Sequence, residues 1–294
     1  MAQTLLAAGH YDEGWTGYEW RYSSAGGGPV PNIKVPRWQG ERFDGRTLLV
    51  VGDQGYGDSF QFARFLPRVK ALGGNLTLGA SHPMAALMKA IPGVDHLFHD
   101  WHYAGAFDCY VPISSLAGVF KITDSELPGP MPYLEADPRK VTRWVRRLGP
   151  SKGRGRIGLC WAGRPTHPND QHRSIPFETR SRYLPAEAEL FFLQKGERAA
   201  DAAGSQIVDL LARLHDFSDT AAVMANLDLV VSVDTSIVHL AGALGRPVRL
   251  LLPYVADWRS GRPRATTTPW YPSVKLFRQS APGDWLPPLA AAFA

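Results

Sequence analysis

From Gly45 onward the chain alternates short apolar runs with amphipathic segments, and this alternation restricts the fold more than any other feature. The pattern is typical of βαβ units, which build parallel sheets covered by helices. It stops at a basic stretch and then restarts. We therefore predict two Rossmann-like α/β domains, 38–137 and 156–294, which face each other across a cleft and are joined by a basic connector, 138–155. The predicted strands are 47–51, 75–78, 94–98, 107–112, 156–161, 190–194, 206–210, 229–233, 248–252 and 275–277, and the predicted helices are 59–72, 83–91, 220–227 and 236–244.

The segment 1–37 is predicted to be a short helical hairpin followed by a linker. Tyr11, Trp15 and Tyr18 fall on one helical face. One hairpin cannot bury such a face alone, so it docks on the body of the protein or belongs to a helical repeat array. The glycines and the proline of 26–29 then indicate a linker.

Composition excludes several classes of protein. A chain of 294 residues that is 45% hydrophobic can build ordinary cores. No run approaches the roughly 20 apolar residues that cross a bilayer, and the first residues lack a secretory signal, so we expect a cytoplasmic protein that does not span a membrane.

Cys109 and Cys160 have no metal-ligand spacing and are expected to be buried thiols. The net charge of +5 concentrates in the connector, whose basic face we expect to be solvated, with no nucleic-acid partner.

The first candidate functional loop follows the predicted strand 47–51. It contains Gly55 and Gly57, which let a backbone approach a ligand, but its spacing is not that of a GxGxxG dinucleotide motif. Asp58 stands where a helix begins. Two roles remain open for it: a helix N-cap, or a general base that takes a proton from a hydroxyl, and one side chain can serve as both.

The second loop, 162–174, follows the strand 156–161. It contains Gly163, His172 and Arg173, and its polarity is typical of a ligand loop. His167, Asp170 and His172 could be read as metal ligands. Arg164 and Arg173 stand among them, however, and they favour an anion over a cation.

Two further loops end strands of the second domain. Lys195 follows an apolar strand, where its ammonium is either the first solvated group or a point charge for a phosphate. The run Asp234, Thr235, Ser236 turns a strand into a helix and exposes hydroxyl and N–H groups to a ligand. His239 follows one turn later, and a buried core histidine is the simpler account of it. A ligand that carries a diphosphate would use all of these groups.

Several motifs together resemble a known family. They are Gln54-Gly-Tyr-Gly-Asp58, Trp161-Ala-Gly163, His172-Arg-Ser174, Gln194-Lys-Gly196, Asp234-Thr-Ser-Ile-Val-His-Leu-Ala-Gly-Ala-Leu-Gly245 and Asp257-Trp-Arg259. They are similar to those of bacterial TPR-associated glycosyltransferases related to the ADP-heptose:lipopolysaccharide heptosyltransferases of glycosyltransferase family 9. The resemblance covers roughly residues 38–285, and the N-terminal hairpin resembles the last helices of a TPR array.

The resemblance implies a GT-B fold and an inverting transfer that needs no metal or other cofactor. It implies a nucleotide-diphosphate sugar as donor, and a glycan, a lipid-linked saccharide or a protein as acceptor. Asp58 is then the implied base. The implied donor-binding residues are Arg173, Gln194, Lys195, Asp234, Thr235, Ser236 and His239.

The sequence also departs from the family. Asp53 stands where a glutamate is usual, and the segment 175–183 replaces an expected apolar helix. The divergent segment leaves open a nucleotide-sugar-binding or scaffold protein with little turnover. A nucleotide-sugar epimerase also stays open, because that chemistry uses two facing Rossmann-like domains as well.

Overall fold

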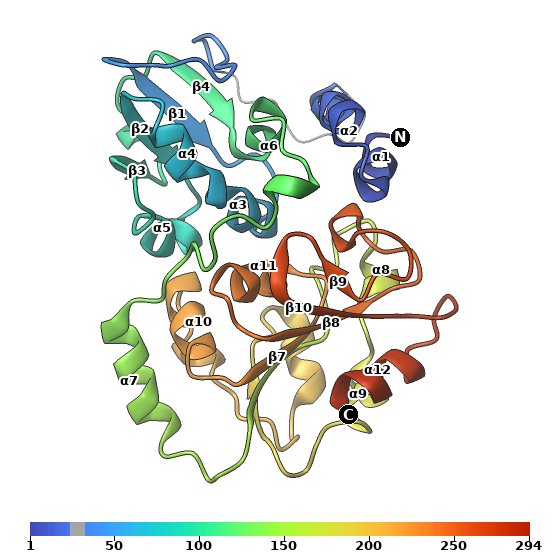
Figure 1. The fold of residues 1–294 in the computed structure, drawn as a ribbon. Helices are drawn as coiled ribbons and strands as arrows, with labels where there is room; N and C mark the ends of the chain where they lie inside the picture. The colour runs from blue at the N-terminus through green and yellow to red at the C-terminus, as the bar shows by residue number, and fades with distance from the viewer. Residues whose placement is uncertain (24–32) are drawn as a thin grey trace. The chain divides into compact units, whose positions relative to one another are not determined.

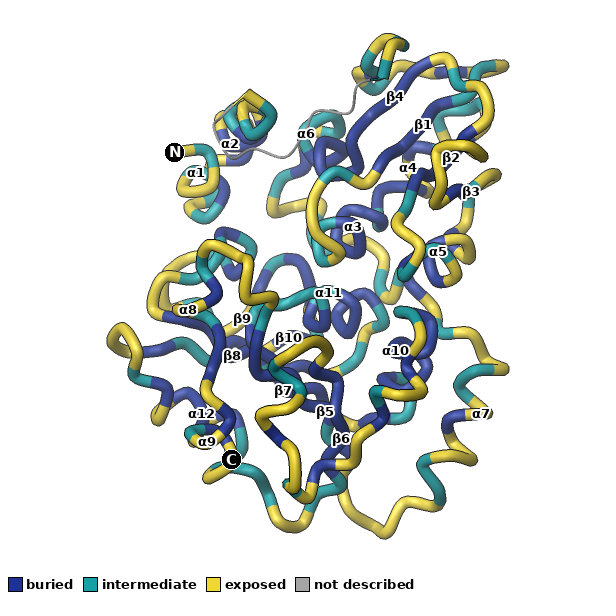
Figure 2. Tube along the Cα trace, turned by 180° about the vertical axis from the view of Figure 1, so that it is seen from behind, coloured by how far each residue is buried: buried dark blue, intermediate teal, exposed yellow. Residues whose placement is uncertain are grey.

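The computed structural model describes residues 1–23 and 33–294, and the predicted glycine-rich linker lies largely outside these ranges. The described chain forms two compact units, Met1–Glu135 and Ala136–Ala294 (Figure 1). Each unit contains one sheet, and the strands of both sheets are largely buried (Figure 2). Within the described ranges, no helix is long and apolar enough to cross a membrane.

The first unit is built on a four-stranded parallel sheet. Its strands are β1 (Thr47–Val51), β2 (Asn75–Gly79), β3 (His96–Phe98) and β4 (Cys109–Pro112), in the order β3-β2-β1-β4. Val51 pairs with Gly79 on one side and with Pro112 on the other, so β1, β2 and β4 end at the same edge. The loops that follow these strands therefore lie together.

The predicted helix 59–72 is interrupted. Helix α3 (Tyr56–Phe62) passes into the 3₁₀ helix η2 (Ala63–Phe65), and α4 (Leu66–Lys70) follows. Pro67 lies in the first turn of α4. Because a proline ring clashes with the carbonyl four residues earlier, a continuous α-helix cannot pass through this position. The next helix, α5 (His82–Met88), begins with Pro83 in the same place.

The N-terminal hairpin docks on the first unit. It consists of α1 (Ala2–Ala8), α2 (Tyr11–Tyr18) and the 3₁₀ helix η1 (Glu19–Tyr22), and α2 packs against α6 (Leu116–Val119). Trp15 is 4% exposed, and its Nε1 donates to the Ile122 carbonyl at 2.7 Å. Tyr11 donates to Asp124 Oδ1 at 2.6 Å. The aromatic face is therefore buried within the unit, and membership of a repeat array stays a prediction.

The second unit is built on a six-stranded sheet. Its strands are β5 (Arg156–Cys160), β6 (Glu189–Phe192), β7 (Leu229–Val233), β8 (Val248–Leu252), β9 (Thr267–Thr268) and β10 (Tyr271–Arg278), in the order β6-β5-β7-β8-β10-β9. All neighbours are parallel except β9, which pairs antiparallel with β10 at the edge.

The predicted strand 206–210 is wrong. In this stretch Val208 makes a single bridge to Phe191. Asp209 Oδ1 then accepts from the Leu211 N–H at 2.7 Å and turns the chain into the 3₁₀ helix η7 (Leu211–Arg213). A local side-chain bond of this kind competes with a sheet ladder, so the apolar run does not extend as a strand.

Helices cover both faces of the second sheet. Helices α9 (Phe177–Ser181) and α12 (Leu286–Phe293) contribute to the core on one face, and α10 (Phe217–Met224) and α11 (Ser236–Ala243) cover the other (Figure 1). The connector forms α7 (Pro138–Leu148), which packs on α10, and Trp144 of α7 is fully buried. Val145 is 48% exposed, so the buried stripe of this helix is narrow.

The divergent segment 175–183 is part of the core. It includes α9, and Ile175 and Arg180 have no exposed surface. Arg180 Nη2 donates to the Val231 carbonyl of β7 at 3.1 Å, and its guanidinium lies over the Trp161 ring. Burial lowers the pKa of Arg180 to about 10. Arg180 and the apolar Ile175 and Phe177 are thus the buried residues of the segment for which the family resemblance implies an apolar helix.

Candidate functional site

In the first unit, Asp58 lies directly beyond the carboxyl end of β1. The loop after β1 leads into α3, whose N-cap is Gly55, and Asp58 is the third helical residue. Its Oδ2 accepts from the Gly55 N–H at 3.0 Å. Asp58 therefore satisfies a backbone donor of the helix start without being the N-cap residue itself. The bond holds the half-buried carboxylate close to the loop that follows β1.

The glycines beside Asp58 allow this geometry. A Cβ on Gly55 would lie 3.3 Å from Asp58 Oδ2, which is tighter than nearly all side-chain contacts. Gly57 is the second residue of α3 and precedes the aspartate directly. The loop thus brings backbone close to the carboxylate, as its glycine content predicts.

In the second unit, Arg173 joins two neighbouring strand ends. It lies in α8 (Asp170–Arg173), beyond β5, and its Nη1 donates to the Asp234 carbonyl at the end of β7, at 2.8 Å. Its Nε lies 3.5 Å from Asp170 Oδ1. This places a guanidinium just before the start of α11, where the helix N–H groups add partial positive charge.

Gly163 and Asp170 complete the support of Arg173. The Gly163 N–H donates to Ser174 Oγ at 2.9 Å, and Ser174 Oγ donates to Asp170 Oδ1 at 2.9 Å. A Cβ on Gly163 would lie 2.3 Å from Arg173 Nη2, so a larger residue here would displace the guanidinium. The loop after β5 is therefore built around the arginine.

The two histidines of this loop, His167 and His172, lie in different surroundings. His172 is exposed, and its Nε2 lies 3.1 Å from Gln171 Nε2. His167 Nδ1 accepts from the Asn169 N–H at 3.2 Å, and burial together with Arg173 lowers the pKa of this histidine. Asp170 is bonded to Ser174 and Arg173 instead. In the described residues, no three His, Cys, Asp or Glu side chains gather as metal ligands would.

Gln194 follows β6, and its side-chain amide is hydrogen-bonded to the protein's own backbone. Its Oε1 accepts from the Trp161 and Ala162 N–H groups at 3.0 and 2.9 Å, and its Nε2 donates to the Lys195 carbonyl at 2.9 Å. It is 2% exposed. Gln194 thus ties the end of β6 to the end of β5, so any effect it has on a ligand passes through the loop after β5.

Lys195 follows at the surface. Its Nζ donates to the Leu214 carbonyl, a bond that uses one of its three N–H groups. Burial lowers the pKa of Lys195, and the charges of Asp216 and Asp219 act in the opposite direction. The ammonium therefore stands near the β6 end with donors left for a phosphate.

Helix α11 begins directly beyond β7. Thr235 is its N-cap, Ser236 is its first residue, and Thr235 Oγ1 lies 3.3 Å from Ser232 Oγ and 3.7 Å from the buried Cys160 Sγ. Asp234 precedes the cap and holds Arg173 through its carbonyl. These residues are half-buried at the sheet edge. Hydroxyl and N–H groups at this helix start suit an anion.

His239 is neither solvated nor a plain core residue. Its Nδ1 lies 3.0 Å from the Tyr271 hydroxyl, and the two rings meet edge to face with centroids 5.7 Å apart. The charge of His239 also acts on Asp257, which is the N-cap of the 3₁₀ helix η8 (Trp258–Ser260) after β8. Burial raises the pKa of Asp257, but Arg259 and then His239 outweigh burial and hold it below its usual value.

Sequence reasoning did not single out Asp257 and Tyr271 as site residues. Asp257 belongs to the Asp-Trp-Arg motif, whose position after a strand was the available signal. Tyr271 begins β10 and is 2% exposed. Folding brings Tyr271 into contact with His239 and Asp257 within reach of its charge, which the order of residues along the chain does not reveal.

Two Rossmann-like units with polar loops at the carboxyl edges of parallel strands define an α/β protein of the GT-B class. ADP-heptose lps heptosyltransferase II of E. coli has this fold, with a TM-score of 0.60, 13% identity, and coverage of 84% of this chain and 96% of that one. The E. coli heptosyltransferase WaaC, solved with ADP, gives a TM-score of 0.55, 16% identity, and coverage of 83% and 97%.

Residues 184–282 match the model of glycosyltransferase family 9 (heptosyltransferase). The chain is also 30% identical over 321 aligned positions to the protein FlbA of Caulobacter vibrioides. This alignment covers 97% of the chain and 52% of FlbA, so the chain spans about half the length of this curated relative.

Proposed function

We propose that the protein is an inverting, metal-independent glycosyltransferase that moves a sugar from a nucleotide-diphosphate donor to a hydroxyl acceptor. The observation that carries the proposal is the Arg173 guanidinium bonded to the Asp234 carbonyl at the start of α11. It supports a diphosphate site because a cation and free helix N–H groups are joined at one strand edge. The family 9 domain match supports the same chemistry.

In the proposed reaction the acceptor oxygen attacks the anomeric carbon of the donor sugar. Asp58 takes the proton of that hydroxyl, while the bond from the anomeric carbon to the diphosphate oxygen breaks and its electron pair leaves with the diphosphate. Attack from the face opposite the leaving group inverts the anomeric centre. The base contributes on the order of 10² to 10⁴ in rate.

The departing diphosphate carries the developing negative charge. Arg173, Lys195 and the α11 start at Thr235 and Ser236 supply fixed positive charge and hydrogen-bond donors to it. Preorganised donors act most strongly where charge develops, and each is worth roughly 3 to 4 kcal/mol of barrier. In this proposal these groups take the part that a divalent metal has in other transferases.

The donor is tested first, with a thermal-shift panel of nucleotides and nucleotide sugars. A ligand at 100 times its Kd stabilises the native state by about 2.7 kcal/mol, which raises the melting temperature measurably. The stabilising nucleotide sugar is then incubated with EDTA and with glycan, lipid-linked saccharide and protein acceptors, and the anomeric configuration of the product is read by NMR.

A product with inverted configuration, formed in EDTA, is the expected result. Retention of configuration, or a strict requirement for a divalent metal, contradicts the proposed mechanism. Binding without turnover across all acceptors favours the scaffold alternative. A changed sugar in the absence of acceptor favours the epimerase.

A further inference from the structure

A buried polar network joins the N-terminal hairpin to the loop that leads to Asp58. Its centre is Asp53, whose carboxylate has no exposed surface. Asp53 Oδ1 accepts from the Ser114 N–H at 3.1 Å, and Oδ2 accepts from Ser114 Oγ at 2.5 Å and from the Tyr22 hydroxyl at 2.7 Å. Ser114 lies in the 3₁₀ helix η4 (Ile113–Ser115), directly beyond β4.

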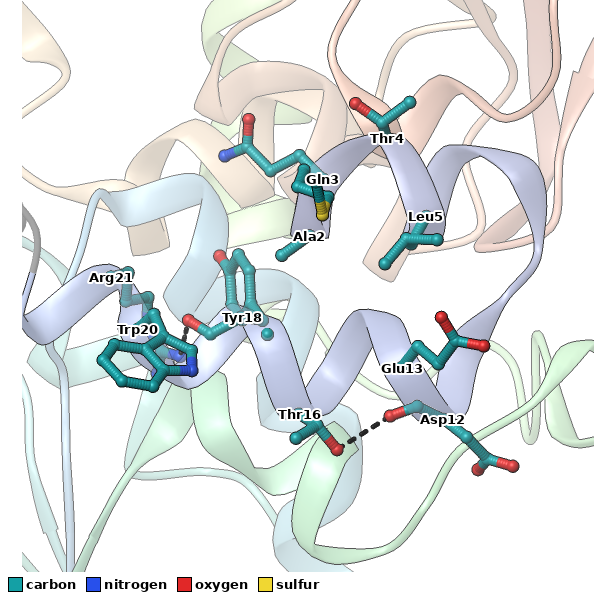
Figure 3. A pocket seen from close by; sticks show the side chains of 12 residues that line it. Ala2, Gln3, Thr4, Leu5, Asp12, Glu13, Thr16, Tyr18, Trp20 and Arg21 are labelled. Carbon is teal, nitrogen blue, oxygen red and sulfur yellow. Dashed lines mark hydrogen bonds between the residues drawn. The ribbon is translucent and has the colours of Figure 1, made fainter.

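Arg21 of η1 supplies the positive charge of this network. Its Nη2 donates to Ser114 Oγ and Ser115 Oγ, both at 2.7 Å, and lies 3.5 Å from Asp53 Oδ2. Its Nη1 donates to the Tyr18 carbonyl at 2.9 Å (Figure 3) and to Glu19 Oε1 at 2.8 Å. The planar guanidinium holds all of these partners at once, which a lysine cannot do.

The charges of the network are balanced. Burial acts to raise the pKa of Glu19, but Arg21 and Arg37 outweigh burial and lower it. Burial and the Asp53 carboxylate both raise the pKa of Tyr22, so its hydroxyl stays a donor. A compensated network of this kind fixes geometry, because removing one partner leaves another buried charge without its hydrogen bond.

The network continues along the chain to the proposed base. Gln54 Nε2 donates to the Tyr18 hydroxyl of the hairpin at 3.1 Å and to Ser114 Oγ at 3.3 Å. The next residue, Gly55, donates its N–H to Asp58. Asp53 and Gln54, which precede the N-cap Gly55, are thus both bonded to hairpin side chains, and Gly55 in turn holds the Asp58 carboxylate.

We propose that Arg21 and Tyr22 are positioning residues for sugar transfer, which fix the 53–58 loop and, through it, the Asp58 carboxylate. The inference rests on the proposed role of Asp58 as the base. In this inference the hairpin contributes to sugar transfer, and does not only pack on the unit through Trp15. A hollow of about 890 Å³ on the hairpin is lined by residues of α1, α2 and η1, among them Arg21 (Figure 3), so a molecule bound there would contact this network.

The test compares Tyr22→Phe with Tyr11→Phe. Each substitution removes one hydroxyl from the same hairpin, and each hydroxyl donates to an aspartate, but Tyr11 bonds Asp124 and not the loop. Because small misplacement of a reacting group costs up to about 100-fold in rate, we expect Tyr22→Phe to lower kcat about 10- to 100-fold with the donor KM unchanged. Hydrogen exchange of the 52–58 peptide should accelerate in Tyr22→Phe only.

Each result decides one part of the inference. Equal exchange of the 52–58 peptide in both variants overturns the claim that the hairpin fixes the loop, whatever the activity. Faster exchange with parental kcat overturns the claim that this placement matters for transfer. If the parental protein binds no nucleotide sugar, the proposed function fails instead, and the exchange experiment still reports on the network.

Discussion

Replacing Arg173 by lysine tests the proposed diphosphate site at its centre. The substitution keeps one positive charge but shortens the side chain and removes the planar fork. It breaks the 2.8 Å bond to the Asp234 carbonyl and the 3.5 Å pairing with Asp170, whose side chain is only 6% exposed. Two effects therefore follow, one on stability and one on transfer.

The two effects are read by different measurements, unfolding for stability and kcat for transfer. Loss of one hydrogen bond from a charged group costs about 1.5 to 3 kcal/mol of folding free energy. Loss of one preorganised donor to the departing diphosphate lowers kcat by about 10²- to 10³-fold. The protein should therefore remain folded at 25 °C, because a domain of ordinary stability tolerates the first loss.

The assay measures kcat for transfer, the Kd of the nucleoside diphosphate by calorimetry, and unfolding in urea. Arg198→Lys is the matched control, since Arg198 Nη2 also lies near Asp170, 4.0 Å from its Oδ2, and Arg198 is not one of the proposed donor-binding residues. We expect weaker diphosphate binding and slow transfer in Arg173→Lys only. Parental kcat and Kd in Arg173→Lys would refute the assignment of this arginine to the diphosphate.

Two further predictions follow from the same unit. Gly163→Ala would place a Cβ 2.3 Å from Arg173 Nη2 and displace the guanidinium. Loss of one charged hydrogen bond to the ligand then lowers nucleoside diphosphate affinity about tenfold, measured by calorimetry. Gly155→Ala, where a Cβ meets nothing within 4 Å, should bind as the parent does. The pKa of Asp257 is lowered in the folded protein, so its stabilisation is present above the unfolded pKa near 3.9 and is lost as pH falls through the folded value. The urea midpoint of the parent should therefore fall more between pH 5 and pH 3 than that of Asp257→Asn, and equal falls would contradict the shift.

The strands and the loops after them could be predicted because their signals are local. A short apolar run that ends in Gly, Asp or Lys marks both a buried strand and the point where the chain leaves the sheet. This holds for β1 with Asp58 and for β7 with Thr235, whose bounds agree with the expected runs. Parallel pairing then brings the strand ends together without further information from the sequence.

Other features depend on contacts between distant residues. Gln194 stands in a motif with Lys195, yet its amide oxygen accepts from the backbone just beyond β5, 33 and 32 residues earlier. The partners of Asp53 lie 31, 32 and 61 residues away, so no window of sequence contains the network. The run 206–210 has a strand pattern, but the local Asp209 bond ends it after one bridge.

The central claim is that Asp58 removes the acceptor proton while the second unit holds the donor. The most direct measurement compares Asp58→Asn with the parent in donor affinity and in transfer rate. Asparagine keeps an oxygen for the Gly55 N–H but cannot accept the proton as a carboxylate does. We predict unchanged donor Kd with kcat lowered by about 10²- to 10⁴-fold. Transfer by Asp58→Asn at the parental rate would contradict the account.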